Sequence, residues 1–211
     1  MSNCKANILL AVLAGALCSL GYPDTIECWA AMPRGQNTMG MYTADDGTGV
    51  ANRDANANTI VRAYLVVTRP TADSLQGWEC KIEVPDNVIP TQWKIYGIRP
   101  INIASPPDFA VGLAEPINCL NITVIAHCEF LVMTTDPAYF YLHPVSVRPS
   151  LPGLMIYAVG NDPGTFVSMQ WSSGSESYAI FGINTGPLPH IDGGHINTES
   201  QSWGSVKMMY R

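Results

Sequence analysis

The stretch Gly77-Trp-Glu-Cys-Lys-Ile-Glu-Val84 alternates apolar and charged side chains without a break. Strict alternation is the period of a β-strand, in which successive side chains point to opposite faces of the sheet. The two faces carry different sets of side chains: Trp78, Cys80, Ile82 and Val84 on one, and Glu79, Lys81 and Glu83 on the other. The pattern therefore predicts an antiparallel sheet with one packed face and one face in water.

Further strands are predicted on both sides of this one, separated by segments rich in Gly, Pro, Asn and Asp. They cover residues 38–43, 59–68, 87–97, 109–113, 120–134, 138–143, 154–159, 165–171 and 178–184. The apolar run in 59–68 predicts a strand covered on both faces, and Pro90 predicts a sheet edge or a bulge. Because no helical period intervenes, the fold class is all-β, a single antiparallel β-sandwich of jelly-roll or immunoglobulin-like type with about nine strands.

The composition agrees with this fold class and excludes others. The chain has 211 residues, of which 47% are hydrophobic and 13% are charged. Typical chains carry about 25% charged residues, so a helical or coiled-coil architecture is disfavoured. Eleven basic residues against seventeen acidic ones, a net charge of -6, leave no basic patch for a phosphate backbone. We therefore expect no nucleic-acid partner.

The N-terminus predicts export. Lys5 is followed by a short apolar run and then by small residues, which is the pattern of a secretory signal peptide. We assign residues 1–21 to this signal peptide, 22–35 to a lead-in, 36–185 to the sandwich, and 186–211 to a linker and C-terminal tag that could form a short helix. The mature chain is expected to be secreted or held at the cell surface, without a membrane span.

Four cysteines remain after removal of the leader: Cys28, Cys80, Cys119 and Cys128. In an oxidising compartment they favour disulfides, and three pairings are possible. A bridge between Cys119 and Cys128 would need the chain to bend back, and Cys28 with Cys80 is the complementary pair. The four cysteines could instead bind zinc, but the closely spaced pairs of cysteine ligands that structural zinc sites need do not occur in this sequence.

Oxygen-bearing side chains suggest a calcium site in one loop. Asp54, Asn56 and Asn58 alternate as calcium ligands do, and Asp45 could add a carboxylate. The alternative is a plain turn, because Asp and Asn also bond to their own backbone. No other cofactor is expected. His190 and His195 offer imidazoles, but in a Gly- and Pro-rich linker that gives a metal little support.

Aromatic residues suggest a second kind of site, and no catalytic residue is identified. Trp93 and Trp171 are the predicted exposed pair for stacking on sugar rings. Glu79 and Glu83 lie about 13 Å apart along a strand at about 3.3 Å per residue. A glycosidase pair needs about 5–9.5 Å, so an enzyme is disfavoured.

Several segments resemble a group of uncharacterised exported bacterial proteins whose core is similar to cohesin-type and carbohydrate-binding β-sandwiches. The segments are Met39-Gly-Met-Tyr-Thr43, Ala63-Tyr-Leu-Val-Val-Thr68, Leu75-Gln-Gly-Trp-Glu79 and Pro107-Asp-Phe-Ala-Val-Gly112. The likeness covers about residues 36–185 and implies fold more than function.

Three functions remain, in order of preference. The first is a non-enzymatic interaction or structural module with a protein or glycan partner at the cell surface. The second is a carbohydrate-binding module that uses exposed aromatics with or without calcium. The third is a glycan-active hydrolase, for which no carboxylate pair is found.

Overall fold

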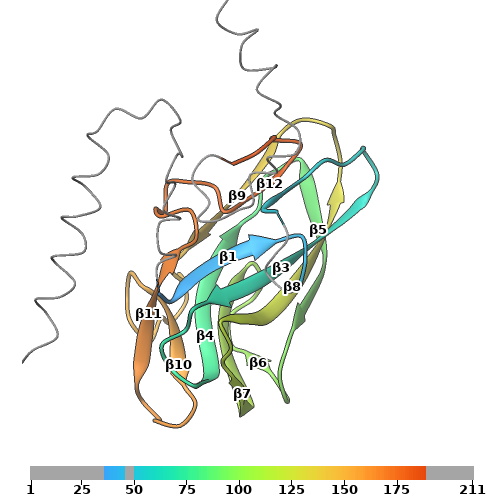
Figure 1. Ribbon diagram of the computed structural model, residues 1–211. Helices are drawn as coiled ribbons and strands as arrows, with labels where there is room; N and C mark the ends of the chain where they lie inside the picture. The colour runs from blue at the N-terminus through green and yellow to red at the C-terminus, as the bar shows by residue number, and fades with distance from the viewer. Residues whose placement is uncertain (1–35, 46–49, 189–211) are drawn as a thin grey trace, which may run out of the picture. The chain divides into compact units, whose positions relative to one another are not determined.

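The computed structural model describes residues 36–45 and 50–188 (Figure 1). These residues form twelve strands and no helix, so the predicted all-β class is confirmed. The strands are β1 (Thr38–Tyr42), β2 (Asn52–Arg53), β3 (Ile60–Thr68), β4 (Ser74–Glu83), β5 (Val88–Ile95), β6 (Ile101–Asn102), β7 (Asp108–Asn118), β8 (Ile122–Val132), β9 (Ala138–His143), β10 (Met155–Val159), β11 (Phe166–Trp171) and β12 (Phe181–Ile183). No helix in this part of the chain is long and apolar enough to cross a membrane.

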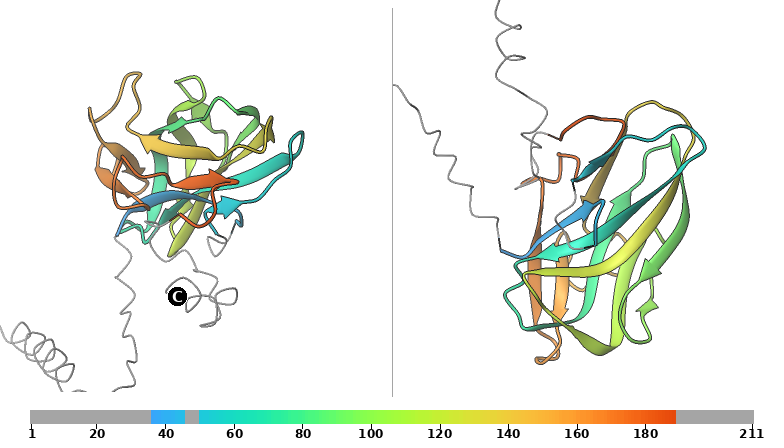
Figure 2. Two further views of the ribbon diagram at one scale, coloured as in Figure 1. Left: turned by 90° about the horizontal axis from the view of Figure 1, so that it is seen from above. Right: turned by 45° about the vertical axis from the view of Figure 1, so that its right-hand side comes forward.

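The strands form two layers joined along one side. The first layer has the order β5-β8-β3-β1, and all its neighbours are antiparallel. In the second layer β4 is central, with β7 on one side and β10 and β9 on the other. β1 pairs in parallel with β11, and this contact joins the layers, as the orange strands beside the start of blue β1 show (Figures 1 and 2).

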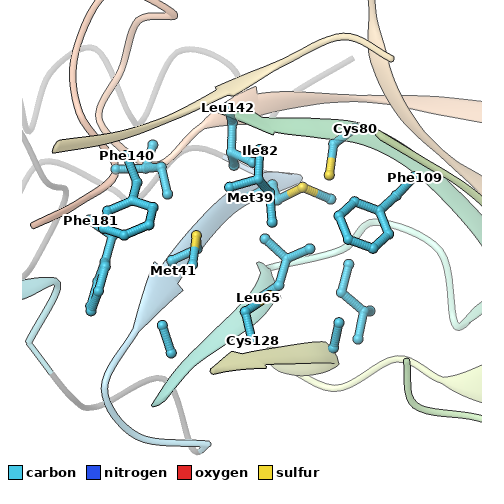
Figure 3. Packing of buried hydrophobic residues seen from close by; sticks show 14 of the residues in the cluster. Met39, Met41, Leu65, Cys80, Ile82, Phe109, Cys128, Phe140, Leu142 and Phe181 are labelled. Atoms are coloured by element: carbon cyan, nitrogen blue, oxygen red, sulfur yellow. The ribbon is translucent and has the colours of Figure 1, made fainter. Parts of the chain in front are cut away.

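The core lies between the layers and contains the apolar set of the alternating strand. Trp78, Cys80 and Ile82 are buried as predicted, while Val84 is half-buried. Met39, Met41 and Leu65 of the first layer meet side chains from β4, β7, β9 and β12 (Figure 3). Burial of a large apolar side chain contributes about 1.5–3 kcal/mol, so this interface is the main source of stability.

The outer face of the second layer is partly covered, which corrects the prediction that Glu79 lies on a face in water. Glu79 is buried because the loop between β9 and β10 folds over it. Its carboxylate accepts hydrogen bonds from the amide and hydroxyl of Ser150. Asp108 accepts the corresponding pair from Ser146, at 3.0 and 2.7 Å. Two carboxylates of the sheet therefore hold this loop down.

The outer face of the first layer is covered only at one end. Tyr42, Ala51 and Val66 form a small apolar cluster there, with Tyr64 packed against it. At the other end of β3, Ile60 and Arg62 are exposed. The prediction of a strand covered on both faces is therefore wrong for the first half of β3. The remaining surface is an open sheet face.

Candidate functional site

The open sheet face consists of side chains that point outward from the middle of the first layer. Strand register arranges them in three rows across β3, β8 and β5. The rows are Ile60, Leu131 and Ile89, then Arg62, Glu129 and Gln92, then Tyr64, His127 and Lys94, and Tyr96 follows at the end of β5. We call these ten residues the open face. Alternation along three neighbouring strands gathers them on one surface.

The first row is aliphatic and exposed. Ile60 is 59% exposed and Ile89 is 46% exposed, and Leu131 lies between them on β8. Met133, which follows β8, is also exposed. Single exposed apolar side chains are common, but adjacent ones held in register form a contiguous patch, which is typical of an interaction surface.

The second row carries one charge of each sign. Nε of Arg62 donates a hydrogen bond to Oε1 of Glu129 at 2.9 Å, and Nη2 of Arg62 forms an ion pair with the same oxygen. This hydrogen bond raises the pKa of Arg62, and Tyr64 adds to the effect. Arg62 is about half exposed, whereas the Glu129 side chain is 16% exposed. The pair fixes two long side chains within the open face.

The third row is aromatic and centres on His127. The hydroxyl of Tyr96 lies 2.8 Å from Nδ1 of His127, and the ring of Tyr64 meets the imidazole edge-on. Burial lowers the pKa of His127, and the positive charges of Arg62 and Lys94 lower it further, while Glu129 opposes them. The imidazole is therefore neutral at neutral pH.

Tyr96 borders the open face at the end of β5. Lys94 places its ammonium 5.6 Å from the centroid of the Tyr96 ring, within reach of a cation–π contact. Burial raises the pKa of Tyr96, and the charges of Tyr64 and Asp45 raise it further. The phenol therefore stays protonated and can serve as a hydrogen-bond donor.

The residues of the predicted calcium site are not gathered at one point. Asp45 acts electrostatically on Tyr96, beyond the third row of the open face. Asn58 lies beside the first row, since its amide donates to the carbonyl of Val132 at 2.7 Å. Asp54 and Asn56 are exposed, and Thr59 caps the carbonyl of Asn56 as in an ordinary turn. The described residues contain no group of three His, Cys, Asp or Glu side chains arranged for a metal.

The two tryptophans do not form an exposed pair, so that prediction is wrong. Both are half-buried and pack against the core cluster. Trp93 meets Phe109 and Phe130 edge-on, with centroid distances of 5.2 and 5.7 Å. Trp171 donates its indole N–H to the carbonyl of Leu142 at 2.7 Å. Inward-facing strand positions account for both, because β5 and β11 each turn every second residue to the core.

The predicted bridge between Cys119 and Cys128 is also wrong. Cys80, Cys119 and Cys128 are free thiols. β8 begins at Ile122 and continues past Cys128, so Cys128 lies about 20 Å along the strand from Ile122, whereas Cys119 precedes the strand. A disulfide needs Cα atoms within about 7 Å. Burial raises the pKa of all three thiols. Cys28, the predicted partner of Cys80, lies outside the described residues, as do His190 and His195.

A second polar cluster lies on the second layer, where β9 ends. Nε2 of His143 is 2.8 Å from Glu83, and Nδ1 is 2.7 Å from Glu176. The imidazole therefore bridges the two carboxylates, and the three side chains form one hydrogen-bonded cluster.

The open face is not among the sites predicted from the sequence, although the sequence contains a signal for it. Ile60, Arg62 and Tyr64 alternate with buried positions, as do His127, Glu129 and Leu131. Mixed rows of aliphatic, charged and aromatic residues do not stand out along one strand. They become a surface only when β3, β8 and β5 are placed side by side.

Comparisons with known proteins return structural similarities only. No protein-family model matches the chain, and no curated protein matches it. Among solved structures, this chain is similar to a type II cohesin domain from the cellulosome of Acetivibrio cellulolyticus. The two sequences are 12% identical, the match covers 73% of this chain and 98% of that chain, and the TM-score is 0.46. It is also similar to the seventh ScaB type I cohesin of Pseudobacteroides cellulosolvens, with 13% identity, coverages of 72% and 97%, and a TM-score of 0.41. A third similar structure is the sixth cohesin of scaffoldin B from Acetivibrio cellulolyticus, in complex with a Cel5 dockerin mutant, with 9% identity, coverages of 65% and 99%, and a TM-score of 0.42.

Proposed function

We propose that this chain is a non-enzymatic protein-interaction module that binds its partner through the open face. The observation that carries the proposal is the row of exposed aliphatic residues, Ile60, Leu131 and Ile89, next to a charged row and an aromatic row. An aliphatic patch beside Arg and Tyr side chains has the composition of a protein-binding surface. A regular sheet holds these side chains in place before the partner arrives, which lowers the entropic cost of binding.

The ionisable groups of the open face support binding more than catalysis. Arg62 is engaged by Glu129, and His127 by Tyr96, so each group already has a partner within the chain. Such pairs orient a surface and select its partners by charge. The carbohydrate-binding alternative has lost the exposed tryptophan pair on which it was based.

We place this function outside the cell. The support is the N-terminal sequence, in which Lys5 precedes an apolar run of signal-peptide length. A protein partner in the medium or on the cell surface is then the target of the open face.

Site-specific photo-crosslinking tests the proposal. A photoreactive residue at Gln92, which is exposed on the open face, is expected to give a discrete cross-linked product in the producing culture. The same residue at Ser177, exposed in the loop between β11 and β12, is the matched control and is expected to give none. Ile89→Asp, added to the Gln92 probe, is expected to abolish the product because a charge disrupts the aliphatic row.

Two results would contradict the proposal. One is equal cross-linking from Gln92 and Ser177, and the other is a Gln92 product that Ile89→Asp leaves unchanged. Specific binding on a glycan array that persists in Ile89→Asp would instead favour the carbohydrate-binding alternative.

A further inference from the structure

The rows of the open face are complementary to themselves. Consider a two-fold axis that runs parallel to β3 and β8 and lies midway between them, just above the sheet. Rotation about it places β3 of one copy over β8 of another without shifting any row. Ile60 then meets Leu131 and Arg62 meets Glu129, because these residues are register partners across the two strands. Both meetings are favourable: apolar with apolar, and cation with anion. Tyr64 comes to lie over His127, which is already buried within its own chain.

We propose that the occupant of the open face is a second copy of this chain, packed face to face about this axis. The inference rests on the proposed function, since it requires the open face to be an interaction surface. A symmetric pair needs a surface that is complementary to itself, and strand register supplies that property row by row.

The charges favour a second copy over a strongly acidic or basic partner. Arg62 and Glu129 contribute one charge of each sign, and His127 is neutral at neutral pH. In the pair, two arginines and two glutamates alternate around the axis, so every charge has opposite charges as its nearest neighbours. The partly buried Glu129 gains a second cation, and the exposed Arg62 gains a second carboxylate.

The aliphatic row supplies the apolar part of the contact. Ile60 is 59% exposed and Leu131 is partly exposed in one chain, and a second sheet at the usual spacing of about 10 Å would cover both. Covering them removes the contiguous apolar surface from water, which drives association.

Sedimentation velocity of the purified full chain tests the proposal. The wild-type chain is expected to form a dimer that dissociates on dilution. R62E and E129R are each expected to raise the dissociation constant about tenfold or more, because each places like charges against one another across the axis. Ile101→Arg, at a residue 66% exposed on β6 of the second layer, is the matched control and is expected to leave the dimer intact.

Mixing the two charge variants gives the decisive result. R62E carries two negative groups in the second row, and E129R carries two positive ones, so a mixture of the two is expected to form a heterodimer when neither dimerises alone. Loss of the pair within each chain cannot produce this rescue. Circular dichroism of each variant checks that the sandwich is folded.

Two outcomes would overturn the proposal: a wild-type chain that is monomeric up to about 1 mM, or charge variants that do not recover on mixing. A monomeric chain that still gives a high-mass product from the Gln92 probe would leave the proposed function standing with a different protein as its partner. If the wild-type chain is monomeric and the Gln92 probe gives no cross-linked product, both proposals are wrong.

Discussion

At the scale of single residues, Tyr157 shows how one buried hydroxyl joins distant segments. Its side chain is fully buried, and its hydroxyl donates to Oδ1 of Asn37 at 3.0 Å. The hydroxyl oxygen of Tyr157 accepts hydrogen bonds from the backbone amides of Thr71 and Ala72, each at 3.2 Å. One phenol thus connects β10, the residue before β1, and the turn between β3 and β4.

Tyr157→Phe is expected to lower the free energy of unfolding by about 0.5–1.5 kcal/mol, since the hydrogen bonds of the buried hydroxyl with Asn37 and with the half-buried amide of Ala72 are lost. Urea unfolding followed by fluorescence measures the change. Tyr139→Phe, at an exposed position of β9, is the matched control and should have almost no effect. Equal effects of the two substitutions would show that the hydroxyl network adds nothing to stability.

His127 makes stability depend on pH. Its pKa is lowered in the folded chain, mainly by burial, so the unfolded chain binds more protons below the ordinary imidazole value of about 6.5. The free energy of unfolding should therefore fall as the pH drops from about 6.5 toward the folded pKa, and this loss should level off below it.

The measurement compares melting temperatures of the wild type and His127→Gln across this pH range. The difference between the two proteins should be constant above about pH 6.5 and should shrink or reverse below it. Subtraction removes the contribution of the ionisable groups that the two proteins share. A difference that does not change with pH would contradict the expectation.

At the scale of elements, the loop between β9 and β10 depends on two carboxylates of the sheet. Glu79→Ala removes the acceptor of the Ser150 amide, so hydrogen exchange of that amide should accelerate, while exchange at Ser146, held by Asp108, should change less. Glu115→Ala, at an exposed position of the neighbouring strand β7, is the control and should leave both amides unchanged.

Elements with a regular pattern could be predicted from the sequence, and contacts between elements could not. The alternation around Trp78 located β4 and its buried side, and Pro90 correctly marked an edge strand with a shift of register. Trp93 and Trp171 were placed outward because nearby turn residues suggested exposure. Their packing depends on Phe109, Phe130 and Leu142, which come from other strands.

The two short strands, β2 and β6, were not predicted from the sequence for a similar reason. β2 and β6 have two residues each, too few for a period to be visible. β2 exists because β12 lies beside it, and β6 because it pairs with β7. The burial of Glu79 likewise depends on a loop that begins only after His143, so no pattern near Glu79 predicts it.

At the scale of the whole molecule, strands near the beginning of the described chain pair with strands near its end. β1 lies parallel to β11, and β2 lies parallel to β12. Phe181 on β12 packs against Phe140 with a centroid distance of 5.5 Å, and Ile183 is also buried. The core is therefore complete only when β11 and β12 are in place.

A chain that ends after Val159 lacks both strands and is expected to lose cooperative thermal unfolding, because its second layer is left open. A chain that ends after Leu188 keeps every described strand and should still unfold in one sharp transition. Calorimetry distinguishes the two. A cooperative transition in the shorter chain would mean that the remaining strands suffice as a folding unit.

The parallel contacts of β1 and β2 also constrain the order of events during synthesis. These two strands leave the ribosome more than a hundred residues before β11 and β12 do. At about 5–20 residues per second, they wait for several seconds without those neighbours. Throughout that interval the hydrophobic core that buries Met39 and Met41 is incomplete. The nascent polypeptide therefore cannot close its core until its final strands emerge.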